Sequence, residues 1–252
     1  MLKIAQISDC HLYADRTKCG YGHINPYQSL ARVLNELAGQ PLDLLLVTGD
    51  VSADGSAQSY QHFSQLINDS GLTCDFIILP GNHDEPGNLR QEFAEHNLWF
   101  SYDAHSPLLL ANWHIHLLDT KTAGSGGALS DAALDELEQA LASSTEHFHL
   151  LGAHHHPLPC HAWMDQHGWH NAERLLALVE RYPLVKGMIY GHIHHGSEQQ
   201  RGQCNFMSCP STCWQWAMQP QFGLSEQAPG YRLLELTSQG QLNTHIHRVE
   251  SF

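Results

Sequence analysis

The chain has 252 residues, of which 42% are hydrophobic and 15% charged, so it can build a core and does not have the composition of a disordered chain. Its formal charge of −14 disfavours nucleic-acid polymers and anionic membranes as partners. The N-terminus lacks the apolar stretch of a signal peptide, and the sequence shows no apolar run long enough for a transmembrane helix. Seven cysteines without a CxxC spacing favour reduced thiols, and we expect a cytoplasmic protein.

Short apolar runs, each followed by a polar turn, predict buried strands along most of the chain. Between the runs, apolar residues at helical spacing predict helices around 30–37, around 134–141 with Ser130 as N-cap, and around 175–179. The tail differs, because its strands have no helices between them. The predicted strands are 2–7, 42–47, 76–79, 114–118, 148–151, 185–190, 203–206, 231–236 and 243–249.

The alternation of strands and helices predicts an α/β core. The helix-free tail predicts a second sheet packed against the first. Because we find no repeat, low-complexity stretch or linker, we expect a single domain over residues 1–252.

Five short motifs rich in Asp, Asn and His follow the predicted strands. In open α/β sheets the loops beyond the carboxyl ends of strands converge, so these motifs are expected to meet. Carboxylate, imidazole and amide donors suit Mn, Fe, Co or Zn, whereas Mg or Ca would favour oxygen ligands. The motifs are Asp9-Cys10-His11, Gly49-Asp50, Gly81-Asn82-His83-Asp84, His154-His155-His156-Pro157 and Gly191-His192-Ile193-His194.

Each motif alone has a plainer interpretation as a turn or a polar loop. Their joint occurrence at strand ends favours a metal centre. Gly49, Gly81 and Gly191 each precede a candidate ligand, which predicts a positive φ or a close backbone approach there.

The order of the five motifs over residues 9–194 resembles the signature of the calcineurin-like metallophosphoesterases. Within that family, the stretches 82–84, 154–159, 163–165 and 210–213 are most similar to class III cyclic-nucleotide phosphodiesterases. The resemblance implies a four-layer α/β/β/α sandwich of two packed mixed sheets, with a dinuclear metal site at the C-terminal ends of strands.

The resemblance also implies a role for each motif residue. The histidine two places before Pro157 is His155, and His154 and His156 are the alternatives. The implied ligands are Asp9, His11 and His194 for one metal, Asn82, His155 and His192 for the other, and Asp50 as the bridge.

Two further residues of the Gly-Asn-His-Asp motif receive roles without binding metal. His83 is expected to face the substrate as a general acid or as a donor to the phosphoryl oxygens. Asp84 is expected to orient a metal-binding imidazole, with a turn cap as the alternative.

The implied activity is hydrolysis of a phosphodiester by a hydroxide that two transition-metal ions share, with 3′,5′-cyclic AMP giving 5′-AMP. Iron and manganese are favoured, and zinc and cobalt are alternatives. Ala53 stands where purple acid phosphatases carry a tyrosine ligand, which disfavours that subfamily. Other phosphoesterases of the fold, such as a nucleotide-sugar pyrophosphatase or a phosphomonoesterase, remain alternatives, and a non-catalytic scaffold is a distant third.

The expected partner is a small phosphodiester or nucleotide, and a homodimer is left open. Aromatic side chains are expected around the pocket, where one could stack on a nucleobase or simply pack. Asn25 is held as a candidate substrate contact. The candidate aromatics are Trp163, Trp169, Trp214 and Trp216.

Overall fold

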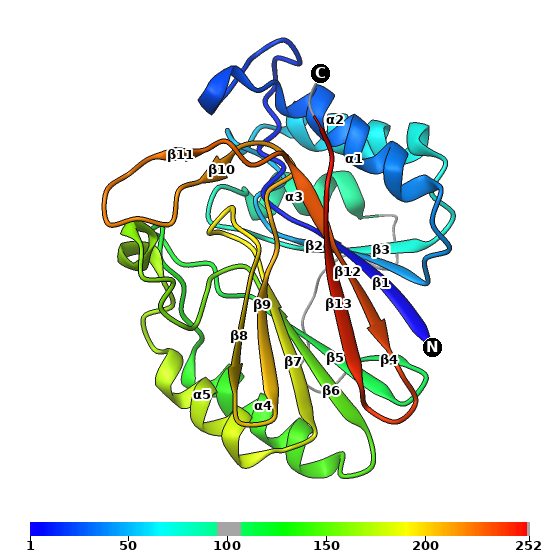
Figure 1. The fold of residues 1–252 in the computed structure, drawn as a ribbon, viewed down its shortest axis with the longest axis vertical. Coiled ribbons are helices and arrows are strands. Elements are labelled where there is room, and N and C mark those ends of the chain that lie inside the picture. The colour runs from blue at the N-terminus through cyan, green and yellow to red at the C-terminus, as the bar shows by residue number, and fades with distance from the viewer. Residues whose placement is uncertain (95–106, 251–252) are drawn as a thin grey trace.

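Two mixed β-sheets pack face to face at the centre of the protein in the computed structural model, which describes residues 1–94 and 107–250 (Figure 1). The first sheet has the order β13-β12-β1-β2-β3. Its strands are β1 (Leu2–Ile7), β2 (Leu44–Thr48), β3 (Asp75–Leu79), β12 (Gly230–Leu236) and β13 (Leu242–Arg248).

The second sheet has the order β4-β5-β6-β7-β9-β8, and β5, β6, β7 and β9 run parallel to one another. A separate two-stranded ribbon joins β10 (Gln215–Trp216) to β11 (Leu224–Ser225). The strands of the second sheet are β4 (Leu108–Leu110), β5 (Trp113–Leu118), β6 (Phe148–Ala153), β7 (Val185–Tyr190), β8 (Ser197–Arg201) and β9 (Cys204–Ser208).

Helices cover the outer face of each sheet (Figure 1). On the first sheet lie α1 (Pro26–Ala38), α2 (Ala57–Ser70) and α3 (Pro86–Phe93), and on the second lie α4 (Asp131–Ser143) and α5 (Ala172–Arg181). Short 3-10 helices span Tyr21–His23 and Trp163–His167. Within the described ranges, the structure contains no helix with the length and apolarity needed to cross a bilayer.

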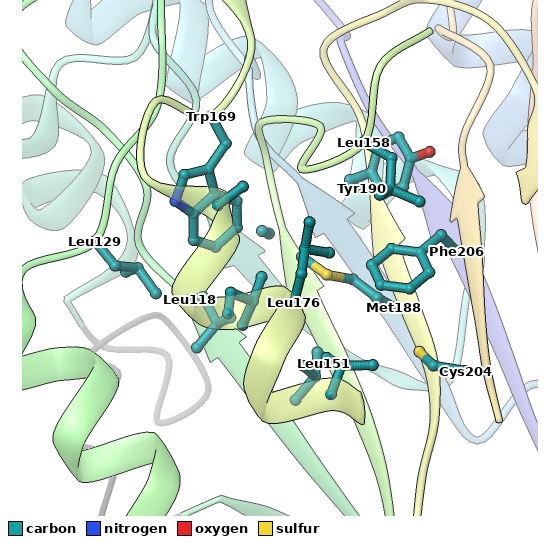
Figure 2. Packing of buried hydrophobic residues seen from close by; sticks show 14 of the residues in the cluster. Leu118, Leu129, Leu151, Leu158, Trp169, Leu176, Met188, Tyr190, Cys204 and Phe206 are labelled. Carbon is teal, nitrogen blue, oxygen red and sulfur yellow. The ribbon is translucent and has the colours of Figure 1, made fainter. Parts of the chain in front are cut away.

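Strand alternation divides the core into three layers. In β1, Ala5 and Ile7 pack against α1 and α2, whereas Ile4 points between the sheets. On the far side, Leu151 and Met188 pack beneath α5 (Figure 2). The predicted four-layer α/β/β/α arrangement is therefore confirmed.

The predicted elements are found with shifts of a few residues, and two helices were not predicted, α2 and α3. One expectation about the tail is wrong. The tail strands form no sheet of their own, because β12 pairs antiparallel with the free side of β1, whereas β9 pairs parallel with β7.

Candidate dinuclear metal centre

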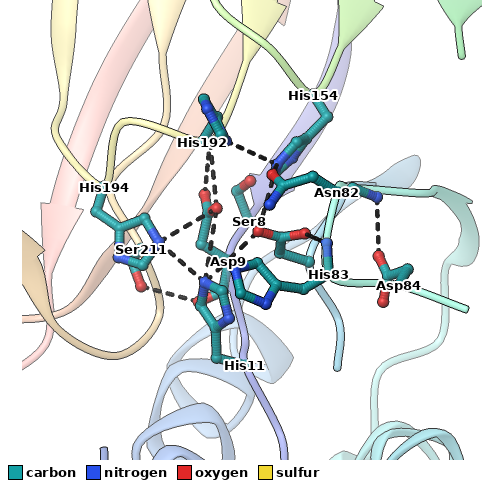
Figure 3. Close-up of polar contacts among 12 residues, drawn as sticks. Ser8, Asp9, His11, Asn82, His83, Asp84, His154, His192, His194 and Ser211 are labelled. Atoms are coloured by element: carbon teal, nitrogen blue, oxygen red, sulfur yellow. Dashed lines mark hydrogen bonds and ion pairs between the residues drawn. The ribbon is translucent and has the colours of Figure 1, made fainter. Parts of the chain in front are cut away.

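The five motifs meet because the strands before them end at one edge of the two sheets. Asp9 follows β1, Asp50 follows β2 and Asn82 follows β3, and these three strands are parallel. His154 follows β6 and His192 follows β7, which are also parallel. The carboxyl ends of both sheets thus deliver the donors to one place (Figure 3).

Five of the candidate ligands have a left-handed backbone, which is rare for residues other than glycine. The φ angles are 54° at Asp9, 48° at His11, 53° at Asp50, 69° at His192 and 44° at His194. Such conformations cost energy and persist where the surrounding structure holds them, often at functional sites. Their concentration at the strand ends supports a site that aims side chains inward.

The glycines before the ligands behave as predicted. Gly49 has a φ of 98°, and a Cβ there would meet the His154 ring. A Cβ on Gly81 would overlap Asp50, and one on Gly191 would overlap Ser8. These are close approaches that a larger residue would disrupt.

The first donor set brings together Asp9, His11 and His194. The Nε2 atoms of His11 and His194 lie 3.0 Å apart, and Asp9 Oδ1 lies 3.4 Å from His194 Nε2. His194 Nδ1 is 2.8 Å from the carbonyl oxygen of Trp214, which fixes the proton on Nδ1 and leaves Nε2 as a bare donor to a metal. All three side chains are buried.

The second donor set brings together Asn82, His154 and His192. His154 Nε2 lies 3.1 Å from Asn82 Oδ1 and 3.2 Å from His192 Nδ1. Asp50 stands between the sets, with its Oδ2 3.4 Å from His154 Nε2 and 3.7 Å from His11 Nε2. One carboxylate oxygen is therefore near both sets.

The triple histidine separates into three different environments. His154 donates from Nδ1 to the carbonyl of Thr48 at 2.7 Å, and this bond turns its Nε2 toward the centre. His155 instead turns Nδ1 to Thr120 Oγ1 at 2.8 Å, and its Nε2 has no hydrogen-bond partner in the described parts of the chain. His156 lies 3.6 Å from Asp165. The geometry favours His154 over His155, the residue chosen from the sequence, although the His155 ring is 4.6 Å from that of His192.

Electrostatics keep Asp50, His11 and His192 in forms that bind cations. Burial tends to raise the pKa of Asp50, but the neighbouring His154 and His11 lower it well below its usual range. Burial lowers the pKa of His11 to about 3 and depresses that of His192 strongly. A carboxylate and neutral imidazoles are the states in which these groups ligate metal. His154 is the exception, because burial lowers its pKa but Asp50 beside it raises the pKa to about 9, so His154 has to release a proton when a metal binds.

Asp84 contacts backbone N–H groups and a tyrosine hydroxyl rather than an imidazole, so the expected role does not match its contacts. It accepts hydrogen bonds from the N–H groups of Gly81 and Ser52, at 2.9 and 3.0 Å, and from the hydroxyl of Tyr60 at 3.1 Å. Burial, reinforced by Asp50, raises the pKa of Asp84 to about 6. Asp84 joins the loop that carries Asp50 to the loop that carries Asn82.

A cavity of about 450 Å³ opens beside the donors, and His83 lies on its wall. The His83 side chain is exposed, and its backbone N–H donates to Asp50 Oδ1 at 2.8 Å. Its ring meets that of His11 edge-on at 5.0 Å. Ala53 also lines this cavity.

Aromatic side chains form one wall of the cavity. Trp214 stacks on His11 at 5.2 Å, and Trp216 stacks on His194 at 4.8 Å. Trp163 lies edge-on to Trp216 at 5.5 Å. These three tryptophans border the pocket as expected, whereas Trp169 is buried in the core beneath α5 (Figure 2).

Asn25 is a helix cap and is not among the residues that line the cavity. Its Oδ1 accepts from the backbone of Gln28 at 3.0 Å, and its amide donates to the carbonyl of Arg16 at 2.8 Å. Both polar ends of the Asn25 side chain are therefore occupied at the start of α1. Asn25 is thus a helix cap and not the substrate contact suggested from the sequence.

Three residues near the site were not found from the sequence. Lys121 donates to the carbonyl of Asn82 at 2.7 Å, and no motif marks this lysine. Tyr21 and Phe222 also line the cavity and are 51% and 53% exposed. Tyr21 begins a short 3-10 helix between two glycines and Phe222 precedes Gly223 in a loop, and an exposed aromatic cannot be recognised from such a local sequence.

Comparison with known proteins agrees with this geometry. A family model described as calcineurin-like phosphoesterase matches residues 2–196. The chain belongs to the calcineurin-like phosphoesterase family and is a phosphoester hydrolase. Enzymes of this kind use two metal ions, and the donor sets on either side of Asp50 supply suitable ligands for two.

Two relatives share most of their length with this chain. A Pseudomonas aeruginosa protein named 3′,5′-cyclic adenosine monophosphate phosphodiesterase CpdA is 37% identical over 98% of this chain and 90% of its own length. The protein of the same name from Escherichia coli strain K12 is 35% identical over the same shares. Among solved structures, a dimetal phosphatase from Danio rerio has the same fold, with a TM-score of 0.66 and 14% identity over 99% of both chains.

Proposed function

We propose that this protein hydrolyses 3′,5′-cyclic AMP to 5′-AMP at a dinuclear centre of iron or manganese. The observation that carries the proposal is the meeting of two donor sets at one carboxylate, Asp50, on the floor of an aromatic-lined cavity. The names of the Pseudomonas and Escherichia relatives support the choice of a cyclic nucleotide.

The proposed ligand sets follow the distances described above. Asp9, His11 and His194 would hold one ion, Asn82, His154 and His192 the other, and Asp50 both. Mixed carboxylate, amide and imidazole donors suit Fe and Mn, with Zn and Co as substitutes. His154 takes the place of His155 because it alone of the two contacts Asp50 and Asn82 directly.

When bound, two such ions supply Lewis-acid polarisation of a phosphate and a water whose pKa is lowered toward about 7. The protein contributes the geometry. Asp50 fixes the spacing of the donor sets, and its Oδ1 holds the backbone of His83. The exposed His83 side chain is then placed to donate a proton to the departing 3′-oxygen, which as an alkoxide leaves poorly without one.

The cavity accommodates a nucleotide. Its volume of about 450 Å³ lies within the usual range for small-ligand sites, roughly 300–1,000 Å³. Trp216 and Phe222, 5.4 Å apart, together with Trp163, offer faces on which a base can stack, and the phosphate would lie toward Asp50 and His83. The seven cysteines are all free, which supports a reducing compartment, the cytoplasm, as the place of action.

A substrate panel tests the proposal. Metal-replete protein is offered 3′,5′-cyclic AMP, 2′,3′-cyclic AMP, a nucleotide sugar and p-nitrophenyl phosphate, and products are separated by chromatography. We expect the highest kcat/KM for 3′,5′-cyclic AMP, with 5′-AMP as the product. A higher kcat/KM for the nucleotide sugar or the phosphomonoester would assign the site to another phosphoesterase activity.

A further inference from the structure

A second cluster of histidines lies on β5 and β6, away from the dinuclear centre. His114 and His116 belong to β5, and His149 lies opposite His114 on β6. One ring nitrogen from each of the three lies within 4.8 Å of one from each other residue. His149 lies on β6 five residues before His154, which directly follows that strand, so the cluster is about 16 Å from the centre, near the amino ends of the strands.

The histidines contact one another and one loop. His116 Nε2 lies 2.9 Å from His149 Nδ1, and the other nitrogen of His149 lies 3.2 Å from the carbonyl oxygen of Ser144. Because a carbonyl only accepts, His149 carries its proton on Nε2 and presents a bare Nδ1 to His116. An N–H to carbonyl bond behind a bare nitrogen is the arrangement that orients histidine ligands in metal sites.

One ring nitrogen of His116 lacks a hydrogen bond in the described parts of the chain. Its side chain is fully buried, yet its Nδ1 has no hydrogen-bond partner within residues 1–94 and 107–250. Buried polar atoms are nearly always paired, so an unpaired one calls for an explanation. In the metal-free state the proton between the two rings is on His116 Nε2. If this proton moves to His116 Nδ1, the lone pairs of His116 Nε2 and His149 Nδ1 face each other and can bind an ion, and no proton is released overall.

The third histidine, His114, completes the group of three nitrogen ligands and lies where an ion can reach them from solvent. His114 is half-buried, and its Nδ1 lies 3.2 Å from the hydroxyl of Ser144. The ring of His147 stacks on it at 4.3 Å. An ion can therefore enter beside His114, while His116 and His149 hold it from the buried side.

We propose that His114, His116 and His149 form a third metal site, which binds a divalent ion of the zinc type. Three imidazoles with an open fourth position match the ligand set of tetrahedral zinc. Neutral nitrogen donors favour Zn²⁺ over Mn²⁺, which has the weakest affinity of the divalent series. The site is independent of the proposed hydrolysis, because none of its residues lines the cavity.

Zinc counting tests the proposal in the full-length protein. Wild-type protein is stripped with a chelator, saturated with Zn²⁺, freed of unbound metal and analysed for zinc per chain. His114→Asn removes the half-exposed ligand, and His245→Asn removes an exposed histidine of β13 as the matched control. We expect His114→Asn to bind one zinc fewer than wild type, or to bind it at least about tenfold more weakly, and His245→Asn to match wild type.

Occupancy of the third site is measured by the difference in zinc per chain between wild type and His114→Asn, and not by the total zinc content. His116→Gln, which removes a buried ligand, should show the same loss, and both variants should keep wild-type hydrolysis of cyclic AMP with manganese. Equal zinc content and affinity in wild type and His114→Asn would overturn the site. Absence of cyclic AMP hydrolysis in all of these proteins would instead count against the proposed function.

Discussion

Asp50 links three parts of the site through the two oxygens of one carboxylate. Oδ2 faces the Nε2 atoms of His11 and His154, and Oδ1 accepts the backbone N–H of His83. A change at Asp50 would therefore disturb both donor sets and the position of the proposed acid. The left-handed φ at this residue, 53°, shows that the fold holds it there against its own backbone preference.

The three adjacent histidines give a prediction about metal content. His154→Ala should lose one of the two ions, because its Nε2 faces Asp50 and Asn82 directly. His155→Ala and His156→Ala should keep both, and these two variants serve as each other's control. Elemental analysis of manganese-loaded proteins decides the matter, and retention of two ions by His154→Ala together with a loss in His155→Ala would restore the sequence-based choice.

The sequence identifies the histidine motif but not the histidine. β6 ends at Ala153, so the strand alternation that would fix side-chain directions stops just before His154. In the turn that follows, the directions depend on contacts with Thr48 and Thr120, residues distant in the sequence. Tertiary contacts of this kind cannot be predicted from local spacing.

His83 gives a prediction that separates binding from chemistry. His83→Ala should keep both ions, because its exposed ring lies on the cavity wall and the seven proposed ligands do not include it, although one of its ring nitrogens lies within 4.8 Å of Asp50 and His11. The rate on cyclic AMP should fall about ten- to a thousandfold further than the rate on bis-p-nitrophenyl phosphate, whose leaving group needs no proton. Single-turnover rates on the two substrates measure this difference. Equal losses would mean that His83 acts on the phosphoryl oxygens.

Among the elements, the loops after β2 and β3 are tied together by Asp84. The carboxylate accepts from Gly81 and Ser52 and from Tyr60 on α2. The sequence places Asp84 beside the ligands but cannot show that its partners are backbone N–H groups and the hydroxyl of Tyr60. Helix α2 was missed for a related reason. Its buried face includes the polar residues Ser59 and His62 beside Tyr60 and Phe63, so apolar side chains alone do not outline that face.

The start of α1 gives a prediction at this scale. Asn25→Ala removes a side-chain cap, so the free energy of unfolding should fall by about 1 kcal/mol. KM for cyclic AMP should not change, because Asn25 is not part of the cavity lining. Trp216→Ala is the contrasting variant and should raise KM by removing a cavity wall. A raised KM in Asn25→Ala without loss of stability would show that Asn25 contacts the substrate.

For the molecule as a whole, the short apolar runs that end in a motif or turn predicted an α/β core, and the resemblance to the family supplied the four-layer α/β/β/α order. The assignment of the tail strands to the two sheets could not be predicted, since pairing of β12 with β1 joins segments more than 200 residues apart. Local patterns indicate that a strand exists, whereas its neighbour depends on the packing of the completed sheet.

Buried histidines make the stability of the whole chain depend on pH. Burial, followed by the neighbouring His149, lowers the pKa of His116 to about 3, and burial lowers the pKa of His149 to about 4. Unfolded histidines titrate near about 6.5. Below that value the unfolded chain binds protons that the folded chain excludes, so stability present at pH 7 is lost as the pH falls toward about 4.

The loss should reach up to about 1.4 kcal/mol per pH unit for each such histidine. Urea unfolding of chelator-treated protein between pH 7 and pH 5 measures it. His116→Gln should show a shallower dependence than wild type, by about one proton. A free energy of unfolding that does not change over this range would contradict the burial of neutral histidines.

If Asp50 serves two ions in the hydrolysis of a cyclic nucleotide, Asp50→Ala must lower both the metal content and the rate. Manganese content and the rate of conversion of cyclic AMP to 5′-AMP are measured on the same samples of wild type, Asp50→Ala and the control Asp69→Ala, an exposed site on α2. We expect close to two manganese ions in wild type and Asp69→Ala, and fewer than two in Asp50→Ala with activity lost. Near-normal turnover by Asp50→Ala would contradict this role of Asp50.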